Sequence, residues 1–264
     1  MLKIERQQKI REHLLAHNRV TVEGISRMLK VTPATVRTDF RELEAEGYLV
    51  RFHGGASLNV FEYQEDVIHK AVGMNAIEHD AGKTEVGVVA SQLIQEKEWI
   101  FLGPGTTTYY IAKALAHRTS IHVLTNSLLV ANALGGSPSC EVRLLGGNIH
   151  AEGLYTQPAN LHAELKGVYL SKAFFSVDGV DISSGYTLSD MNVLDLFKTI
   201  YANCGRMFMA IDRSKFNRRA FMKLDSLEMQ HSVITNDDPP ENFLAYYQAH
   251  GVKVYTKSSM EKPQ

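Results

Sequence analysis

The chain has 264 residues, of which 44% are hydrophobic, and a formal net charge of −1 at pH 7. This length has room for a small domain beside a larger one, and the charge excludes a polycation. The two cysteines, Cys140 and Cys204, fit neither a metal site nor a disulfide framework, so both are expected to be reduced. The start MLKIERQQ lacks the apolar core of a signal peptide, and no stretch is long enough to span a membrane. We therefore expect a soluble, cytoplasmic protein with no membrane partner.

The N-terminal region is predicted to be helical and mildly basic. Through position 56 the chain carries ten Lys and Arg against seven Asp and Glu, whereas the remainder is acidic. Ile10 and Leu14 lie one turn apart in a first predicted helix, Lys3–His17. Ile25 and Met28–Leu29 have helical spacing and predict a second, short helix. The charge permits contact with nucleic acid but does not establish it.

A third helix is predicted after a tight turn. Thr32 is a good N-cap, and Pro33 suits the first helical position because its missing N–H is not needed there. The residues at the buried spacing of this helix are Val36, Phe40 and Leu43. Two helices joined by a tight turn, the second of them amphipathic, are typical of a helix-turn-helix motif.

The polar face of the third helix carries short hydroxyls and guanidinium groups. Such groups near a helix N-terminus can reach base edges and phosphates in the major groove of DNA. For these residues taken alone, a solvated helix face is the alternative interpretation, whereas the whole ordered pattern favours DNA binding. The candidate DNA contacts on this helix are Thr32, Thr35, Arg37, Thr38 and Arg41.

A wing is predicted directly after the third helix. Tyr48–Phe52 has the residue types of a short strand, and His53–Ala56 has those of a turn. Arg51 and His53 are placed to touch the phosphate backbone of DNA. For His53, a hydrogen bond to a local carbonyl is an equally good interpretation. We therefore expect a winged helix-turn-helix domain over residues 1–57.

The stretch VTVEGISRMLKVTPATVRTDFRELEAEGYLVRFHGGA is similar to a known family pattern. It resembles the DeoR-family helix-turn-helix, in which V-S-x-x-T-I-R-R-D-L is followed by R-x-H-G-G-A. Thr38 stands where the family usually has a second arginine, and Lys30 where it often has glycine. The first departure removes one contact, so the operator is expected to differ from that of a typical relative. The positions that match are Thr32, Thr35, Val36, Arg37, Asp39 and Phe40.

A larger α/β domain is predicted over residues 75–257, after a linker at 58–74 that has no clear periodicity. Within this domain, apolar runs alternate with amphipathic helical patterns. Such alternation is typical of a mostly parallel sheet covered by helices. The predicted strands are Trp99–Leu102, Ile121–Thr125, Val142–Leu145, Ala173–Val177, Met207–Ile211, Val233–Thr235 and Val252–Tyr255.

Small, hydroxyl and charged residues follow most of the predicted strands. Gly103–Thr108 follows the first strand, Asn126–Ser127 the second, Gly146–Gly147 the third and Asp178–Asp181 the fourth. In open α/β sheets, ligands bind in the crevice outside the carboxyl ends of the strands. The pattern therefore predicts a ligand site at that edge of the sheet.

The predicted ligand contains one phosphate. The loop Gly103–Thr108 leads into a helix, and its N–H groups, hydroxyls and helix dipole are suited to an anion. The loop is neither a Walker motif nor a dinucleotide fingerprint. Asn126, Asp178 and Asp181 are expected to bond sugar hydroxyls, with turn and cap chemistry as the alternative for the aspartates. The predicted effector residues are Lys83, Gly105, Thr106, Thr107, Thr108, Asn126, Gly146, Gly147, Asp178, Asp181, Lys198 and Lys215. No catalytic residue, metal ligand or cofactor is predicted.

Five short stretches of the larger domain match a known sensor domain. They are GTTT at Gly105–Thr108, TNS at Thr125–Ser127, LLGG at Leu144–Gly147, DGVD at Asp178–Asp181 and D-x-S-K-F at Asp212–Phe216. The domain resembles the sugar-phosphate sensor of DeoR-family regulators, which is similar in fold to ribose-5-phosphate isomerase. The resemblance implies tetramers that sense phosphorylated sugars. Gly103 replaces a usual aspartate and Leu194 a usual glutamate, which implies either an unusual effector or a weaker hold on one of its hydroxyls.

The combined patterns predict a sequence-specific DNA-binding transcriptional regulator controlled by a phosphorylated sugar. The family resemblance implies a repressor that the effector releases. The expected partners are a double-stranded DNA operator, the sugar phosphate and further copies of the chain, as a dimer or tetramer. The alternative is an isomerase-like enzyme fused to a DNA-binding head, because paired aspartates with a lysine can perform acid–base chemistry. The two departures remove carboxylates that proton transfer needs, so no enzyme is expected.

Overall fold

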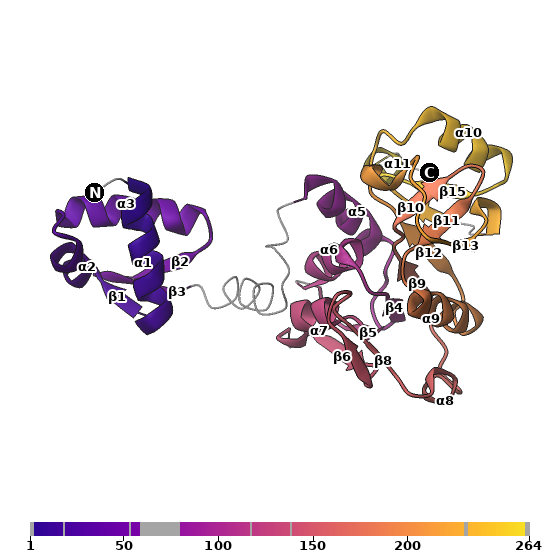
Figure 1. The fold of residues 1–264 in the computed structure, drawn as a ribbon, viewed down its shortest axis with the longest axis horizontal. Helices are drawn as coiled ribbons and strands as arrows, with labels where there is room; N and C mark the ends of the chain where they lie inside the picture. Colours follow the sequence, from indigo (N-terminus) through magenta and orange to yellow (C-terminus); the bar gives the residue numbers. More distant parts are fainter. Residues whose placement is uncertain are drawn as a thin grey trace. The chain divides into compact units, whose positions relative to one another are not determined.

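The chain forms two compact units, Met1–Ala76 and Ile77–Gln264 (Figure 1). The computed structural model describes residues 3–17, 19–52, 54–58, 80–116, 118–137, 139–229 and 232–261. Positions 59–74 of the predicted linker and the predicted wing residue His53 lie outside the described residues. Within the described ranges, every helix is too short or too polar to span a bilayer.

The first unit is a winged helix-turn-helix, as predicted. Its helices are α1 Lys3–His17, α2 Val22–Leu29 and α3 Pro33–Ala45, and its strands are β1 Arg19–Thr21, β2 Leu49–Phe52 and β3 Gly55–Leu58. The strands form an antiparallel sheet in the order β1-β3-β2. Gly55 and Ala56, which were predicted to lie in a turn, instead begin β3, because they pair with Thr21 and Val20 of β1.

The core of the first unit consists of the predicted apolar stripes of its three helices. Ile10, Leu14 and Ile25 are buried against Val36 and Phe40 of α3. The strands complete this core with Val20, Leu49 and Ala56. Met28 does not belong to it, since its side chain is 43% exposed.

The second unit is built on a seven-stranded sheet in which every pairing is parallel. All seven predicted strands are present, with ends shifted by two residues or fewer. The sheet has the order β15-β14-β12-β9-β4-β5-β6. The strands are β4 Trp99–Leu102, β5 Ile121–Thr125, β6 Cys140–Leu144, β9 Lys172–Phe175, β12 Met207–Ala210, β14 Ser232–Ile234 and β15 Lys253–Tyr255.

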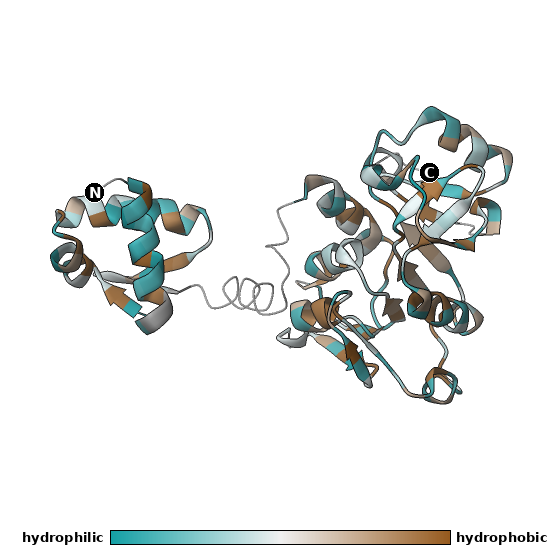
Figure 2. Ribbon diagram, in the orientation of Figure 1, coloured by the Kyte–Doolittle hydropathy of each residue, from teal (hydrophilic) through white to brown (hydrophobic). Residues whose placement is uncertain are grey.

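Successive residues of a strand point to opposite faces of the sheet. Here the residues on both faces are apolar, so helices cover both faces. Ile100 and Leu102 face one core with α5, α6 and α7, whereas Phe101 faces the other with α9 and α10. Figure 2 shows the central strands in brown, as hydrophobic, between helices that carry teal, hydrophilic residues. The helices are α5 Ala81–Gln92, α6 Thr106–Leu115, α7 Leu128–Gly135, α8 Leu161–Glu164, α9 Met191–Ala202, α10 Glu241–Ala249 and α11 Lys257–Glu261.

Shorter elements extend the loops at the carboxyl ends of the strands. One is the hairpin β7 Asn148–His150 and β8 Tyr155–Gln157. Another is a three-stranded sheet of β10 Gly179–Asp181, β11 Gly185–Leu188 and β13 Met222–Asp225. Two single 3₁₀ turns complete the unit, at Arg213–Lys215 and Leu227–Met229.

The strand order reverses direction between β4 and β9. From β4 the chain proceeds through β5 to β6 on one side, and then it returns to β9 on the other side of β4. The loops after β4 and β9 therefore diverge, and a crevice opens between them at the carboxyl ends of the strands.

Candidate DNA interface and effector site

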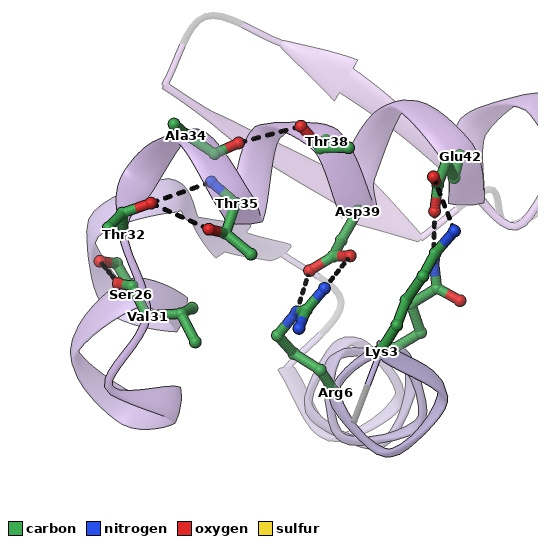
Figure 3. Close-up of polar contacts among 11 residues, drawn as sticks. Lys3, Arg6, Ser26, Val31, Thr32, Ala34, Thr35, Thr38, Asp39 and Glu42 are labelled. Carbon is green, nitrogen blue, oxygen red and sulfur yellow. Dashed lines mark hydrogen bonds and ion pairs between the residues drawn. The ribbon is translucent and has the colours of Figure 1, made fainter. Parts of the chain in front are cut away.

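Helix α3 presents a face of threonine and arginine side chains. The Oγ1 of Thr32 caps the helix by accepting the N–H of Thr35 at 3.2 Å, and it lies 2.9 Å from the Thr35 hydroxyl (Figure 3). The hydroxyl of Thr38 donates to the carbonyl of Ala34 at 3.2 Å. Thr32 and Thr38 are exposed and Thr35 is half-buried. Their hydroxyls are thus oriented by the helix itself, with the first of them acting as its cap.

Arg37 and Arg41 are the unpaired cations of this face. Both side chains are exposed, and neither has an ion-pair partner among the residues that the structure describes. An unpaired guanidinium presents donors in a planar fork that matches phosphate and guanine. Both guanidinium groups are therefore free of partners among the described residues.

Two of the acidic residues of α3, Asp39 and Glu42, are bound by side chains of α1. Asp39, which is 1% exposed, accepts two hydrogen bonds from Arg6, at 2.5 Å from Nε and 2.9 Å from Nη2 (Figure 3). Glu42 accepts from Lys3 at 2.8 Å and from Gln7 at 2.7 Å. The helix is thereby sorted into an acidic face bound to α1 and a face that carries unpaired positive charge.

The wing is tied to the same helix through Arg51. Its Nε lies 2.6 Å from Glu44 Oε2, and its backbone N–H donates to Glu44 Oε1 at 3.0 Å. These two bonds hold the pKa of the Glu44 carboxyl below its usual range. Arg51 therefore fastens the wing to α3, while its side chain stays 40% exposed.

A cavity of about 720 Å³ lies at the switch point of the second unit. The loop after β4 lines it on one side, and Ser176–Asp178, directly after β9, line it on the other. Two strand ends that are neighbours in the sheet but far apart in sequence therefore form one site. The predicted effector residues that line it are Gly105, Thr106, Thr107, Asp178 and Lys215.

The loop after β4 is held in shape by its own buried hydrogen bonds. Gly105 has a φ of 124°, a left-handed value that favours glycine, and it provides no side-chain cap for α6. The first N–H groups of α6 therefore have no side-chain acceptor at the N-cap.

The buried Thr108 hydroxyl donates to the carbonyls of Gly103 and Gly105, at 2.7 and 2.8 Å. Thr107 accepts from Ser176 at 3.1 Å, so it links the two sides of the cavity.

The three predicted lysines lie in different surroundings. Lys215 lines the cavity and has no ion-pair partner among the described residues. Lys83 is paired with Asp80, the N-cap of its own helix, at 2.8 Å. Lys198 is exposed on α9 and does not line the cavity. Helical periodicity explains its position, since Phe197 and Ile200 use the buried face of α9.

The two predicted aspartates also differ. Asp178 lines the cavity and accepts the N–H of Ser189 at 2.8 Å. Asp181 lies outside the cavity lining, where it accepts from Ser183 and Ser184 in the turn between β10 and β11. These bonds and Arg219 keep the pKa of Asp181 well below its usual value. The turn chemistry considered for both aspartates thus describes Asp181.

The remaining predicted residues do not line the cavity. Asn126 is buried, and its side-chain amide donates to the Thr156 carbonyl at 3.0 Å, which fastens β8 to the end of β5. Gly146 and Gly147 lie between β6 and the hairpin β7–β8, directly before β7. Gly147 has a φ of 124°, and a Cβ there would lie 2.0 Å from the Gln157 carbonyl oxygen. This glycine is therefore required by the backbone.

Sequence reasoning missed the part of the cavity wall that the hairpin and α9 provide. Tyr155 donates to Asp190 at 2.5 Å, and Asp190 is also the N-cap of α9. Burial and the neighbouring Asp190 raise the pKa of the Tyr155 phenol to about 12. Glu152 and Ser189 line the same wall. Only the capping pattern before α9 gave a sequence signal, and it did not indicate that β8 approaches this helix.

Packing explains both departures from the family pattern in this unit. A Cβ at Gly103 would lie 2.9 Å from the Phe175 ring, so a side chain there would require the ring to move. Leu194 packs against the apolar core on the α9 face of the sheet. Both positions are thus occupied by residues that suit an apolar neighbourhood.

A winged helix-turn-helix joined in one chain to an α/β unit with a polar cavity defines a class of protein, the DNA-binding transcriptional regulators that carry their own sensor. Residues 6–60 match the family model of the DeoR-like helix-turn-helix domain. Residues 78–237 match that of the DeoR C terminal sensor domain. The chain belongs to the DeoR family.

Relatives of nearly the same length agree with this assignment. The lactose phosphotransferase system repressor of Streptococcus mutans serotype c is 32% identical over 94% of this chain and 98% of its own length. The glycerol-3-phosphate regulon repressor of Escherichia coli (strain K12) is 24% identical, over 96% and 99%. A solved structure, ribose 5 phosphate isomerase A from Neisseria gonorrhoeae, gives a TM-score of 0.36 at 15% identity. That likeness covers 52% of this chain and 53% of the isomerase, and no conclusion about activity follows from it.

The buried ion pair between α1 and α3 is expected to control the stability of the first unit. Arg6→Met leaves the Asp39 carboxylate buried without a partner, which costs about 3–5 kcal/mol. Arg6→Met/Asp39→Leu should recover most of this loss, because apolar replacement of a buried pair is often neutral. Urea unfolding of the full chain followed by far-UV circular dichroism measures the effect.

Two controls make this experiment specific. Fluorescence of Trp99, the single tryptophan, reports the second unit and should not change. Lys3→Met removes an exposed ion pair with Glu42 and should leave the stability nearly unchanged. An Arg6→Met protein as stable as the wild type would contradict a structural role for the pair.

Proposed function

We propose that the chain is a regulator whose affinity for its operator is controlled by a phosphorylated sugar bound in the second unit. The observation that carries the proposal is the cavity at the switch point, where the uncapped N-terminus of α6 and Lys215 face the same space. Backbone N–H groups at a helix N-terminus bind phosphate well, and a cation adds to the attraction. Asp178 and Ser189 supply groups for sugar hydroxyls on the opposite wall.

The relatives favour the same class of ligand. One is named for the lactose phosphotransferase system and another for glycerol 3-phosphate. We infer that this chain is likewise a repressor, and that its effector weakens operator binding. Such a regulator acts on the chromosome, and hence in the cytoplasm.

On DNA, α3 is proposed to lie in the major groove with the unpaired arginine face toward the bases. Arg37 and Arg41 supply the charge, and the threonine hydroxyls supply short-range contacts. The wing would contact the phosphate backbone through Arg51 and His53. A single first unit covers too little surface for tight binding, so we propose that a dimer or tetramer binds a repeated operator.

An isomerase-like activity is the second candidate function, since Asp178 and Lys215 line one cavity. Acid–base chemistry on a sugar phosphate needs such a pair near the substrate. Incubation of the protein with ribose 5-phosphate, followed by chromatography for ribulose 5-phosphate, tests it. The regulator requires no conversion, whereas turnover would establish the enzyme.

The arginines of α3 are expected to supply much of the affinity for DNA. Arg37→Ala and Arg41→Ala should each weaken operator binding about 5- to 150-fold. Where the lost contact is to a phosphate, the slope of log binding constant against log salt concentration should become shallower by about 1. Fluorescence anisotropy with an operator duplex at several salt concentrations measures both effects. Lys253→Ala, an exposed charge on β15, is the control and should not change binding. Unchanged affinity in both arginine variants would overturn the proposed docking of α3.

Lys215 and Lys198 form a matched pair for locating the effector. A thermal-shift screen of pentose and hexose phosphates should find a ligand that stabilises the protein, by about 2.7 kcal/mol at 100 times its dissociation constant. Lys215→Met should weaken this ligand about 10- to 100-fold, because it removes a charge-assisted hydrogen bond. Lys198→Met should bind as the wild type does. If Lys198→Met weakened the ligand and Lys215→Met did not, the phosphate would not bind at the switch point.

A further inference from the structure

Strand β6 is one edge of the parallel sheet, and no strand among the described residues pairs with its outer side. The N–H of Leu145 donates to the Thr125 carbonyl, in the ladder that pairs Thr125 with Leu144. Because residues of a parallel strand alternate in the direction of their hydrogen-bonding groups, those of Val142 and Leu144 point away from β5. An edge of this kind is a template for another strand unless something protects it.

The charges along β6 are arranged so that they complement a second copy of the same strand. Glu141 and Arg143 flank Val142, and both side chains point to one face, toward His122 and Trp99 of the neighbouring strands. Both are substantially exposed, at 47% and 67%. Edge strands are usually protected by charges that repel a partner. Here the two charges are opposite, lie one residue on either side of Val142, and bond each other, with Arg143 Nε donating to Glu141 Oε1 at 3.1 Å.

Antiparallel pairing with Val142 opposite Val142 of the other copy adds an opposite charge beside each of these side chains. Glu141 of each copy then lies opposite Arg143 of the other, at non-hydrogen-bonded positions where side chains approach most closely. The two valines exchange both of their outward hydrogen bonds. Centring the pair on Glu141 or on Arg143 instead would bring like charges together. The charge pattern therefore favours the register centred on Val142, which brings both opposite-charge pairs together.

A mostly apolar groove of about 360 Å³ reaches this edge from the face of the sheet, where Trp99, Leu124 and Arg143 line it. Its walls include Leu144 and Leu145 at the end of β6 and Leu165 and Tyr169 after α8. The Tyr169 side chain is 86% exposed and that of Leu144 42%. A partner at the edge of β6 would remove part of this apolar surface from water, which favours association.

We propose that β6 pairs antiparallel with β6 of a second copy of this chain, centred on Val142, and so joins two sheets into one. The proposal deepens the homo-oligomer proposed above, and rests on it, by naming the surface and the register. A strand from an unrelated protein could also add to the edge, but it would not require charges that complement themselves.

A charge exchange tests the register in the full-length protein. Glu141→Arg and Arg143→Glu each place like charges opposite one another twice per dimer, and each should weaken dimerisation about 10-fold. The double variant Glu141→Arg/Arg143→Glu restores opposite charges and should dimerise as the wild type does. Sedimentation velocity over a concentration series measures the dissociation constants. Because Glu141 and Arg143 also bond each other within one strand, the exchange repairs that contact as well, so the register is identified by the rescue together with the cross-link.

Cross-linking provides a second test of the same register. Antiparallel pairing about Val142 places the natural Cys140 opposite position 144 of the other copy, with Cα atoms about 5.5 Å apart. Leu144→Cys should therefore form a covalent dimer on mild oxidation. The variant Cys140→Ser/Leu144→Cys retains Cys204 and should form none, which excludes the other thiols.

The possible outcomes separate this proposal from those before it. An oligomer that is insensitive to the charge variants and does not cross-link overturns the β6 interface but leaves the oligomer in place. A monomeric wild-type protein at micromolar concentration overturns both. Rescue by the double variant together with the specific cross-link supports the interface, whatever the effector or operator proves to be.

Discussion

The reversal of strand order between β4 and β9 is the constraint on which the second unit depends. Parallel strands end at one edge of the sheet, and only where the order reverses do the following loops separate enough to leave a cavity. The loop after β4 must turn sharply there into α6, which requires the left-handed Gly105. The same geometry gives α6 an N-terminus without a side-chain cap, facing Lys215. The cavity and the exposed helix N-terminus at its wall thus follow from topology.

In the first unit the corresponding constraint is the placement of charge on α3. The buried pair of Asp39 with Arg6 ties α3 to α1, and Glu42 is held in the same way by Lys3. The acidic residues are thereby neutralised within the protein, while Arg37 and Arg41 remain unpaired among the described residues. A helix with three acidic residues can in this way present a positive face to a polyanion.

Local patterns predicted the elements of both units but not the distances between them. The apolar spacing around Val36 and Phe40 and the seven apolar runs each correspond to a real element. Residues directly after β4 and β9 were predicted for the site and line it. Lys198 and Asn126 do not line it, because the rotation of α9 and the docking of β8 depend on tertiary contacts. For the same reason nothing in the sequence indicated the bond of Tyr155 to Asp190.

We propose that a ligand in the cavity changes the affinity of the first unit for DNA, and the reciprocity of the two binding equilibria tests this directly. The affinity for an operator duplex is measured with and without the sugar phosphate that stabilises the protein. The affinity for that sugar phosphate is then measured with and without the duplex. Linkage requires both affinities to change by the same factor, which we expect to be about 5- to 150-fold. Operator affinity that stays the same when the cavity is saturated would contradict the claim.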